Sequence, residues 1–305
     1  MTRSSGRPGN QKPLIEKLGT IDRGLVETTP VVHRGRLYRF EYVRATYHAN
    51  ETGDSYFRFV DCESGEHSAP FATGYHLGNV FVENDTLYVT GTNAWDGERI
   101  DLFASNDMVS WERWNALDLP GYGLFNTSLC RAADRYVLMF EIGRPVELSG
   151  PGFTARFATS IDLRTWELTA PECTYSKDRY TAPHALRWHD GFYYDFYLEG
   201  VDGGYEQCVV RSPDLIEWTS SPLNPVLAAS DDDRIIANEK LTAEDRQHIA
   251  AAENCNNSDI DFCEFNGELI INYSWGNQRG IEQLAEAVYR GSEAQFLTSW
   301  FPKES

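Results

Sequence analysis

Polar and ionisable side chains recur at the start of strand-like segments in this chain, where packing alone would favour apolar residues. Five such positions hold Glu27, His76, Asn126, His184 and Asp259. Two carboxyl groups in one site can divide acid and base work, because one can stay protonated while the other is ionised. The residue types therefore indicate proton-transfer chemistry at a point where several strands begin.

Further residues extend this set. Asp261 lies two residues after Asp259, a spacing that places both side chains on the same face of a strand. Glu141 lies inside an apolar segment, where an unpaired carboxylate would be costly. Trp95 and Trp275 are candidates for flat apolar platforms that hold a ligand ring.

Each candidate also has a structural explanation. Glu27 and Asp259 could cap the starts of their strands, and His76 and His184 could be core histidines bonded to a neighbour. Glu141 has a counterpart, Glu41, in a similar apolar segment. Both glutamates could be buried partners of arginines, for which the sequence offers Arg39, Arg44 and Arg144.

The strands that would position these residues are indicated by a repeat. A Ser-x-Asp-(Leu/Met)-x-x-Trp turn occurs at residues 105–111, 160–166 and 212–218, and apolar hairpins are centred on residues 38, 88, 138, 194 and 270. Ser and Asp side chains bond backbone N–H groups in tight turns. Trp111, Trp166 and Trp218 repeat with the turn, so we expect them to pack the sheets. The pattern predicts an all-β, five-bladed β-propeller whose inner strands line a central channel.

The repeat also predicts the domain organisation. Residues 1–13 read as a flexible tail, and residues 14–305 as a single propeller domain. Leu241–Ala252 predicts a short helical insertion between blades four and five, with Thr242 and Asp245 as a capping box. Blade one lacks the Trp turn, and residues 291–296 replace it in blade five. Closure there would make Glu27 and Asp259 neighbours.

The net charge and composition limit the classes of molecule that this protein is expected to bind. The chain has 27 Lys and Arg against 46 Asp and Glu, a formal charge of −19. That charge disfavours nucleic acid and anionic membranes. We see no signal peptide or membrane-spanning stretch, and the 6 cysteines form no CxxC pair, so we expect reduced thiols and a cytoplasmic protein. The oligomeric state is left open.

These features resemble the five-bladed glycoside hydrolases of the arabinanase/β-xylosidase (family 43), invertase (family 32) and anhydro-galactosidase (family 117) type. The resemblance rests on the Trp turns, the inward carboxylates and the stretches Asn257–Phe265 and Tyr273–Gln278, which look most like uncharacterised bacterial relatives of that group. It implies a hydrolase acting on a short oligosaccharide or a plant or algal glycan fragment. No cofactor is implied.

The resemblance also implies roles for the candidates. Glu27 matches the blade-one carboxylate, although the usual Asp-Pro is absent, and blade two offers His76 and Asn79 where an Asp is usual. Glycoside hydrolysis needs a proton donor and a second carboxylate. We expect Glu27 or Asp259 as the base and Glu141 or His184 as the acid, with sugar contacts from His76, Asn126, Trp95, Asp261 and Trp275.

The sequence also allows two alternative functions and one candidate metal site. A propeller without a proton donor would be a carbohydrate-binding module. A glycoside phosphorylase would need a basic cluster at the channel mouth, for which the sequence offers Arg44, Arg144 and Arg279. Carboxylate and amide oxygens suit calcium, and Asn257, Asp259 and Asp261 could hold Ca²⁺ in the channel.

Overall fold

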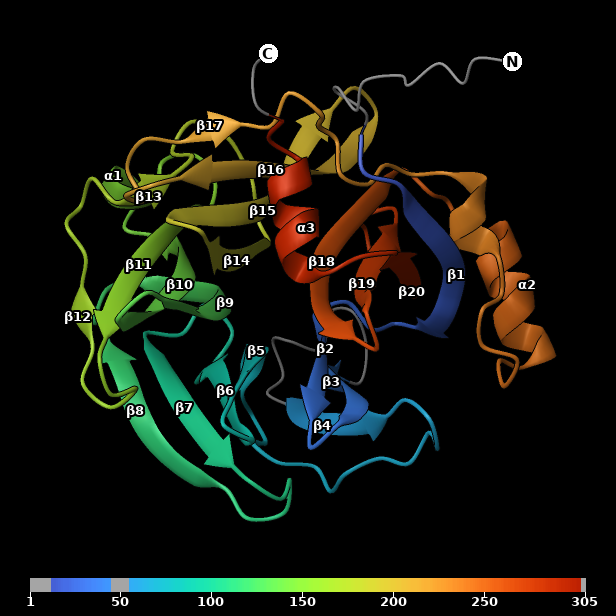
Figure 1. Ribbon diagram of the computed structural model, residues 1–305, viewed down its shortest axis with the longest axis horizontal. Helices are drawn as coiled ribbons and strands as arrows, with labels where there is room; N and C mark the ends of the chain where they lie inside the picture. Colours follow the sequence, from blue (N-terminus) through green and yellow to red (C-terminus); the bar gives the residue numbers. More distant parts are fainter. Residues whose placement is uncertain (1–11, 45–54, 303–305) are drawn as a thin grey trace, which may run out of the picture.

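The computed structural model describes residues 12–44 and 55–302. β-strands dominate, and Figure 1 shows the sheets arranged around a central region, with the N-terminal strand beside the C-terminal sheet. Of the expected N-terminal tail, residues 1–11 lie outside the described part. Among the described residues, no helix has the length and apolar character that a membrane span requires.

Three sheets are built from strands that follow one another in sequence. The three-stranded sheet contains β2 (Thr28–His33), β3 (Arg36–Arg44) and β4 (Ser55–Asp61). The four-stranded sheet contains β5 (His76–Glu83), β6 (Thr86–Thr92), β7 (Arg99–Ser105) and β8 (Glu112–Asp118). The five-stranded sheet contains β9 (Gly123–Ala132), β10 (Arg135–Arg144), β11 (Thr154–Ser160), β12 (Glu167–Leu168) and β13 (Thr174–Tyr175). Neighbouring strands in all three are antiparallel.

The fourth sheet has eight strands in two antiparallel parts. One part contains β14 (His184–His189), β15 (Phe192–Val201), β16 (Gly204–Ser212) and β17 (Thr219–Ser220). The other contains β18 (Asn256–Phe265), β19 (Glu268–Gly276), β20 (Glu282–Tyr289) and β1 (Ile15–Arg23). A single parallel pair, Tyr205 with Asn256, joins the parts. Because β1 pairs with β20, the N-terminal strand completes the sheet built from the end of the chain.

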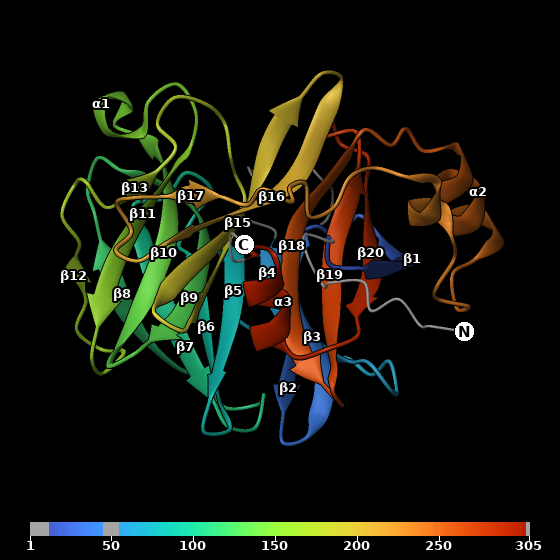
Figure 2. The same cartoon turned by 45° about the horizontal axis from the view of Figure 1, so that its top comes forward.

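Short helices lie between or beyond the strands. They are α1 (Val146–Ser149), the 3-10 helix η2 (Asp231–Arg234), α2 (Ala243–Ala251) and α3 (Glu293–Ser299). A capping box of Thr242 and Asp245 starts α2, which lies at the periphery beside β1 in both ribbon views (Figure 2).

Helix α3 corrects one expectation. The segment that was expected to replace the Trp turn in blade five leads into this helix, with Ser292 as its N-cap. Phe296 is fully buried there and stacks on Phe196, with ring centroids 5.8 Å apart. The helix therefore packs its apolar residues onto the sheet, and β1 supplies the fourth strand at that position.

The repeated turns have the local structure that their side chains predict. In the first turn, the Ser105 hydroxyl accepts a hydrogen bond from the Met108 N–H at 2.9 Å, and the Asp107 carboxylate accepts two more from the backbone. Trp111 then stacks on Phe71 of the preceding sheet, with ring centroids 3.9 Å apart. The equivalent tryptophans in the later turns pack against the preceding cores in the same way, as Trp166 and Trp218 show. These side chains join neighbouring sheets.

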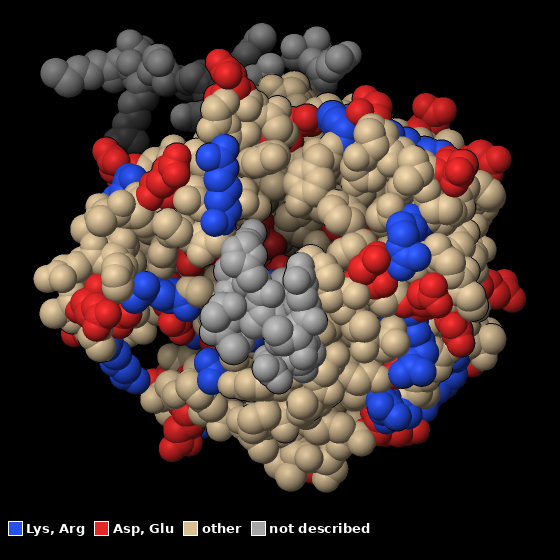
Figure 3. Space-filling model, turned by 180° about the vertical axis from the view of Figure 1, so that it is seen from behind, with Lys and Arg blue, Asp and Glu red and all other residues tan. Residues whose placement is uncertain are grey.

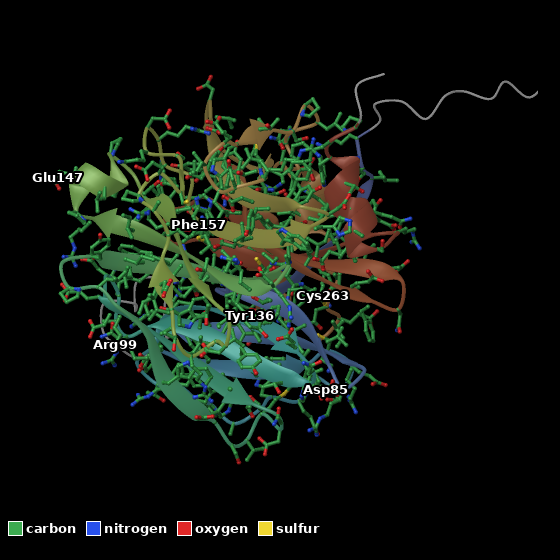
Figure 4. The ribbon with its side chains drawn as sticks, turned by 60° about the vertical axis from the view of Figure 1, so that its left-hand side comes forward. Asp85, Arg99, Tyr136, Glu147, Phe157 and Cys263 are labelled. Carbon is green, nitrogen blue, oxygen red and sulfur yellow. The ribbon has the colours of Figure 1, made fainter. Side chains whose placement is uncertain are left out.

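The loops lie at two opposite ends of the strands. Figure 4 shows Glu147 of α1 and Arg99 near one end, and Asp85 in a hairpin turn toward the other. Trp95, Phe153 and Tyr180 lie in loops and line a cavity at one end of the strands.

Candidate active site

A cavity of about 380 Å³ lies where strands from different sheets converge. Its polar lining residues are Glu27, Arg44, Asn126, Glu141, Asp259 and Gln278, and its aromatic ones are Trp95, Phe125, Phe153, Tyr180 and Tyr205. Figure 3 shows a hollow near the middle of the rear face, with acidic atoms visible inside it. The cavity brings together three of the expected catalytic residues and two of the expected sugar-binding residues.

Glu141 lies inside β10 and is fully buried. The Asn126 amide donates a hydrogen bond to its Oε2 at 3.0 Å, while its Oε1 has no hydrogen-bond partner among the described residues. Burial raises the pKa of Glu141 to about 7; the charges of Asp195 and Asp259 add to this, and His184 opposes it. A carboxyl with this pKa can be protonated near neutral pH and can donate the proton.

Asp259 faces the same cavity because β18 is irregular at this point. The register of β18 against β19 shifts between Ser258 and Asp261, and Asp259 has a positive φ of 53°. Such bulges re-aim a side chain. The hydroxyls of Ser258 and Ser274 each donate to the Asp259 carboxylate at 2.7 Å.

The surroundings of Asp259 set its proton affinity. Burial and the charge of Glu27 both raise the pKa of Asp259, whereas the two hydroxyl donors and Arg44 lower it. Together these effects give a pKa of about 6. Glu27, just ahead of β2, forms an ion pair with Arg44 across 3.6 Å. The effect of the Glu27 charge on the pKa of Asp259 agrees with the expectation that these two carboxylates are neighbours.

Glu282 belongs to the same group of carboxyls, although sequence reasoning missed it. It is the first residue of β20, is 3% exposed, and accepts a hydrogen bond from the Gln278 N–H at 2.6 Å. Burial, followed by the charge of Asp259, raises its pKa to about 8. No motif marks it, because it reaches Asp259 only through the pairing of the last strands.

His184 does not line the 380 Å³ cavity, but it lines a smaller one of about 40 Å³ that Glu27, Asn126 and Asp259 also reach. Its side chain is fully buried, its Nδ1 is 2.8 Å from the Asp195 carboxylate, and its Nε2 is 3.1 Å from the Thr181 hydroxyl. Burial lowers the pKa of His184, but the charges of Asp195 and Glu141 raise it overall. This placement suits a residue that adjusts Glu141 better than one that contacts a ligand.

Two of the expected sugar-binding residues are buried instead. Trp275 has no exposed surface, and its indole N–H donates to Thr20 at 2.9 Å inside the core, so it offers no platform to a sugar ring. His76 is 1% exposed and is 2.6 Å from the Tyr42 hydroxyl, outside the lining of the cavity. Burial, helped by the charge of Arg44, lowers the pKa of His76 to about 4.

Asp261 and Asp259 share only a smaller cavity of about 40 Å³, and Asp259 alone reaches the larger one. Because the bulge interrupts the strand alternation, Asp261 stays out of the 380 Å³ cavity and binds protein groups: the Thr29 hydroxyl at 2.7 Å, the Asn79 amide at 2.9 Å and Arg187. These partners occupy the carboxylate that was expected to contact a sugar.

The three residues expected to hold Ca²⁺ are likewise separated by their partners. Asn257 accepts a hydrogen bond from Lys17 at 2.7 Å and donates to Asp233, while Asp261 binds Arg187. Within residues 12–44 and 55–302, no group of three or more His, Cys, Asp and Glu side chains is arranged to hold a metal ion. Calcium in the channel stays a prediction.

Glu41 has the arginine partners that its sequence pattern suggested. Arg39 contacts its Oε1 through two nitrogens, at 2.8 and 2.5 Å, and Arg58 contacts its Oε2 at 2.7 Å. Within the described ranges Glu141 has no ion pair with an arginine, and Arg144 pairs with Asp96 instead. The structural explanation holds for Glu41 and fails for Glu141.

Comparison with known proteins relies on structure. No protein-family profile matches the chain, and no curated protein matches its sequence. The BT0996–RGII complex superposes with a TM-score of 0.63 at 12% identity, covering 97% of this chain and 96% of that one. The catalytic domain of the Coprinopsis cinerea GH62 α-L-arabinofuranosidase gives 0.62 at 10% identity, covering 91% and 97%.

A third structure extends the same group. A GH43 β-xylosidase/α-arabinofuranosidase from a compost microbial metagenome, in complex with xylotriose, gives a TM-score of 0.54 at 14% identity, covering 91% of this chain and 94% of that one. This chain has the β-propeller fold of these glycoside hydrolases. At such low identities the similarity shows the fold alone. The chemistry of this chain must therefore be inferred from the residues that line its cavity.

Proposed function

We propose that this β-propeller is a five-bladed glycoside hydrolase formed by residues 14–305, with the 380 Å³ cavity as its active site. One observation carries the proposal: two carboxyls, the buried Glu141 and the partly buried Asp259, face one cavity with pKa values raised to about 7 and about 6. An acid and a base are most effective when their pKa values lie near the working pH. Perturbed groups of this kind cluster at functional sites.

The roles follow from the order of the two pKa values. Glu141 holds its proton to the higher pH and is the acid that protonates the departing oxygen. Asp259 ionises first and is the base that activates water at the anomeric carbon. The charge of Glu27 contributes to the raised pKa of Asp259, and Arg44 contacts the Glu27 carboxylate at 3.6 Å.

The substrate is a short oligosaccharide or a fragment of a plant or algal glycan. The similar structures carry names of arabinofuranosidases and a xylosidase, and two of them hold xylotriose or cellotriose. Pentose glycosides are therefore the first compounds to test. The exposed indole of Trp95 lines the cavity and is available for contacts with the ligand, whereas the Asn126 amide donates its hydrogen bond to the acid.

The two alternative functions have weaker support. A binding module would not need two carboxyls with raised pKa values, since an ionised buried carboxylate is costly without a chemical use. A phosphorylase needs several cations, and among the described lining residues Arg44 alone is a cation and is paired with Glu27. Arg144 is paired with Asp96.

The test is a panel of neutral glycosides assayed with the wild type, Glu141→Gln and Asp259→Asn. We expect each variant to lose about 10²- to 10⁴-fold in kcat/KM while it stays folded. Glu112→Gln is the matched control, because Glu112 pairs with Arg164 at the surface, outside the cavity. Turnover that survives in both cavity variants would refute the assignment, and turnover that requires added phosphate would favour the phosphorylase.

A further inference from the structure

One wall of the cavity is a continuous arc of aromatic rings. Trp95, Phe125, Phe153, Tyr180 and Tyr205 all line the cavity. Successive ring centroids along this arc are 5.6, 4.4, 5.8 and 6.1 Å apart, each pair at a steep angle. The rings therefore contact one another around one side of the site, and we call these five residues the aromatic arc.

The backbone leaves room for this arc beside the acid. A side chain at Gly143, two residues after Glu141, would place its Cβ 2.9 Å from ring atoms of both Phe125 and Phe153. That distance is shorter than real contacts allow, so the absence of a side chain lets the two rings close over β10. The centre of the arc is thus fixed next to the strand that carries Glu141.

The centre of the arc, Phe125 and Phe153, lies on the side of the proposed acid. Asn126, which follows Phe125 in β9, donates its amide hydrogen bond to Glu141. Asp259, Glu27 and Arg44 come from β18, the start of β2 and the end of β3. A general acid contacts the oxygen of the leaving group, and the base lies on the other side of the anomeric carbon. The leaving group therefore occupies the space along the arc.

This wall offers few partners for sugar hydroxyls. The Asn126 amide already serves Glu141, and the neighbouring lining residues Ala182 and Pro183 are apolar. Among the described residues of this wall, the indole N–H of Trp95 and the hydroxyls of Tyr180 and Tyr205 are the other polar side-chain groups. Burying hydroxyls without partners is unfavourable, whereas a flat aromatic group gains area and edge-to-face contacts from five rings.

We propose that, besides oligosaccharides, this cavity takes glycosides of aromatic alcohols and prefers them, because their aryl group binds against the aromatic arc; this rests on the proposed hydrolase function. In the reaction the bond between the anomeric carbon and the aglycone oxygen breaks, and that oxygen takes the proton of Glu141. Water adds to the anomeric carbon and gives a proton to Asp259. The products are one free sugar and one aromatic alcohol.

The test compares leaving groups on the same sugar. We expect the benzyl glycoside to be hydrolysed at least about tenfold more efficiently than the methyl glycoside and the matching disaccharide. Tyr205→Ala is expected to lower kcat/KM for the benzyl glycoside about tenfold and to leave that for the methyl glycoside within about twofold, and Trp95→Ala is expected to lower kcat/KM for the benzyl glycoside by a similar factor. Trp114→Ala, a tryptophan outside the cavity, is the control.

A second measurement separates this proposal from the hydrolase function. Binding of benzyl alcohol alone, followed by ligand-observed NMR with the wild type and Trp95→Ala, needs no turnover. We expect binding that Trp95→Ala weakens. Efficient hydrolysis of the disaccharide without preference for the benzyl glycoside would overturn the aromatic leaving group and keep the hydrolase. Absence of benzyl alcohol binding would overturn it whether or not any glycoside is cleaved.

Discussion

Two buried glutamates occupy matching positions in two sheets and have opposite surroundings. Glu41 in β3 and Glu141 in β10 are both 0% exposed, and each follows a buried phenylalanine in the second strand of its hairpin. Glu41 binds Arg39 and Arg58 through both carboxylate oxygens. Glu141 receives one amide hydrogen bond, and its second oxygen has no partner in the described part of the chain.

The difference comes from neighbouring residues in the strands. Arg39 stands two residues before Glu41 on the same face of β3, whereas Met139 holds that place in β10. Across the sheet, Glu41 pairs with Arg58 and Glu141 pairs with Ala155. The same residue at the same place in a repeat can thus serve structure or chemistry, and its local cations decide which.

The largest change in stability is expected when Glu41 is replaced. Glu41→Gln removes the charge that pairs with two largely buried arginines, and breaking such a network costs on the order of 3 kcal/mol in the free energy of unfolding. Urea denaturation at pH 7 measures this. A loss no greater than that of the surface control Glu112→Gln would show that the network does not stabilise the fold.

Glu141→Gln is expected to change stability in the opposite direction. Because the folded pKa of Glu141 is about 7 and its ordinary value is 4.5, ionisation penalises the folded state increasingly from pH 4.5 to pH 7. Removing the carboxyl gains up to about 3 kcal/mol at pH 8 and little at pH 4. Thermal or urea unfolding across this pH range measures the difference, and a pH-independent effect would contradict the raised pKa.

The two raised pKa values predict a narrow pH range for activity. Rates fall below about pH 6, where Asp259 becomes protonated, and above about pH 7, where Glu141 loses its proton. A pH profile of kcat/KM on the best glycoside of the panel is the measurement. A rate that stays flat from pH 5 to pH 9 would be incompatible with this pair of groups.

The smallest effect is expected at His184, which positions and tunes Glu141. Asp195, Glu141 and Arg179 are the charged groups that act on His184, and Thr181 and Tyr175 also contact its ring. The charge of His184 lowers the pKa of Glu141, so His184→Gln moves the basic limb of the kcat/KM profile to higher pH. An unchanged basic limb with reduced stability would assign His184 a structural role alone.

Much of the architecture was open to prediction from local chemistry. The Ser-x-Asp turns form through hydrogen bonds within a few residues, so their sequence predicts their structure. The positions of Glu27 and Asp259 at strand starts follow from the same repeat, and Glu141 was marked as a charge in an apolar strand. These signals are local, and one sequence contains them.

The errors concern contacts that depend on register between strands. The bulge at Asp259 separates it from Asp261, although strict alternation would place them together. Trp275 and His76 turn into the core rather than the cavity, which their polar or aromatic neighbours could not reveal. Glu282 joins the site only because β20 pairs beside β19 near Asp259.

The claim that Glu141 is the proton donor has one direct test. It asks how the loss of hydrolysis rate in Glu141→Gln depends on the leaving group of the substrate. Hydrolysis of an alkyl glycoside, whose departing oxygen needs a proton, is expected to fall about 10²- to 10⁴-fold relative to the wild type. Hydrolysis of the dinitrophenyl glycoside of the same sugar, whose leaving group departs as a stable anion, is expected to fall less than about tenfold. An equal loss for both substrates would contradict the role of Glu141 as the acid.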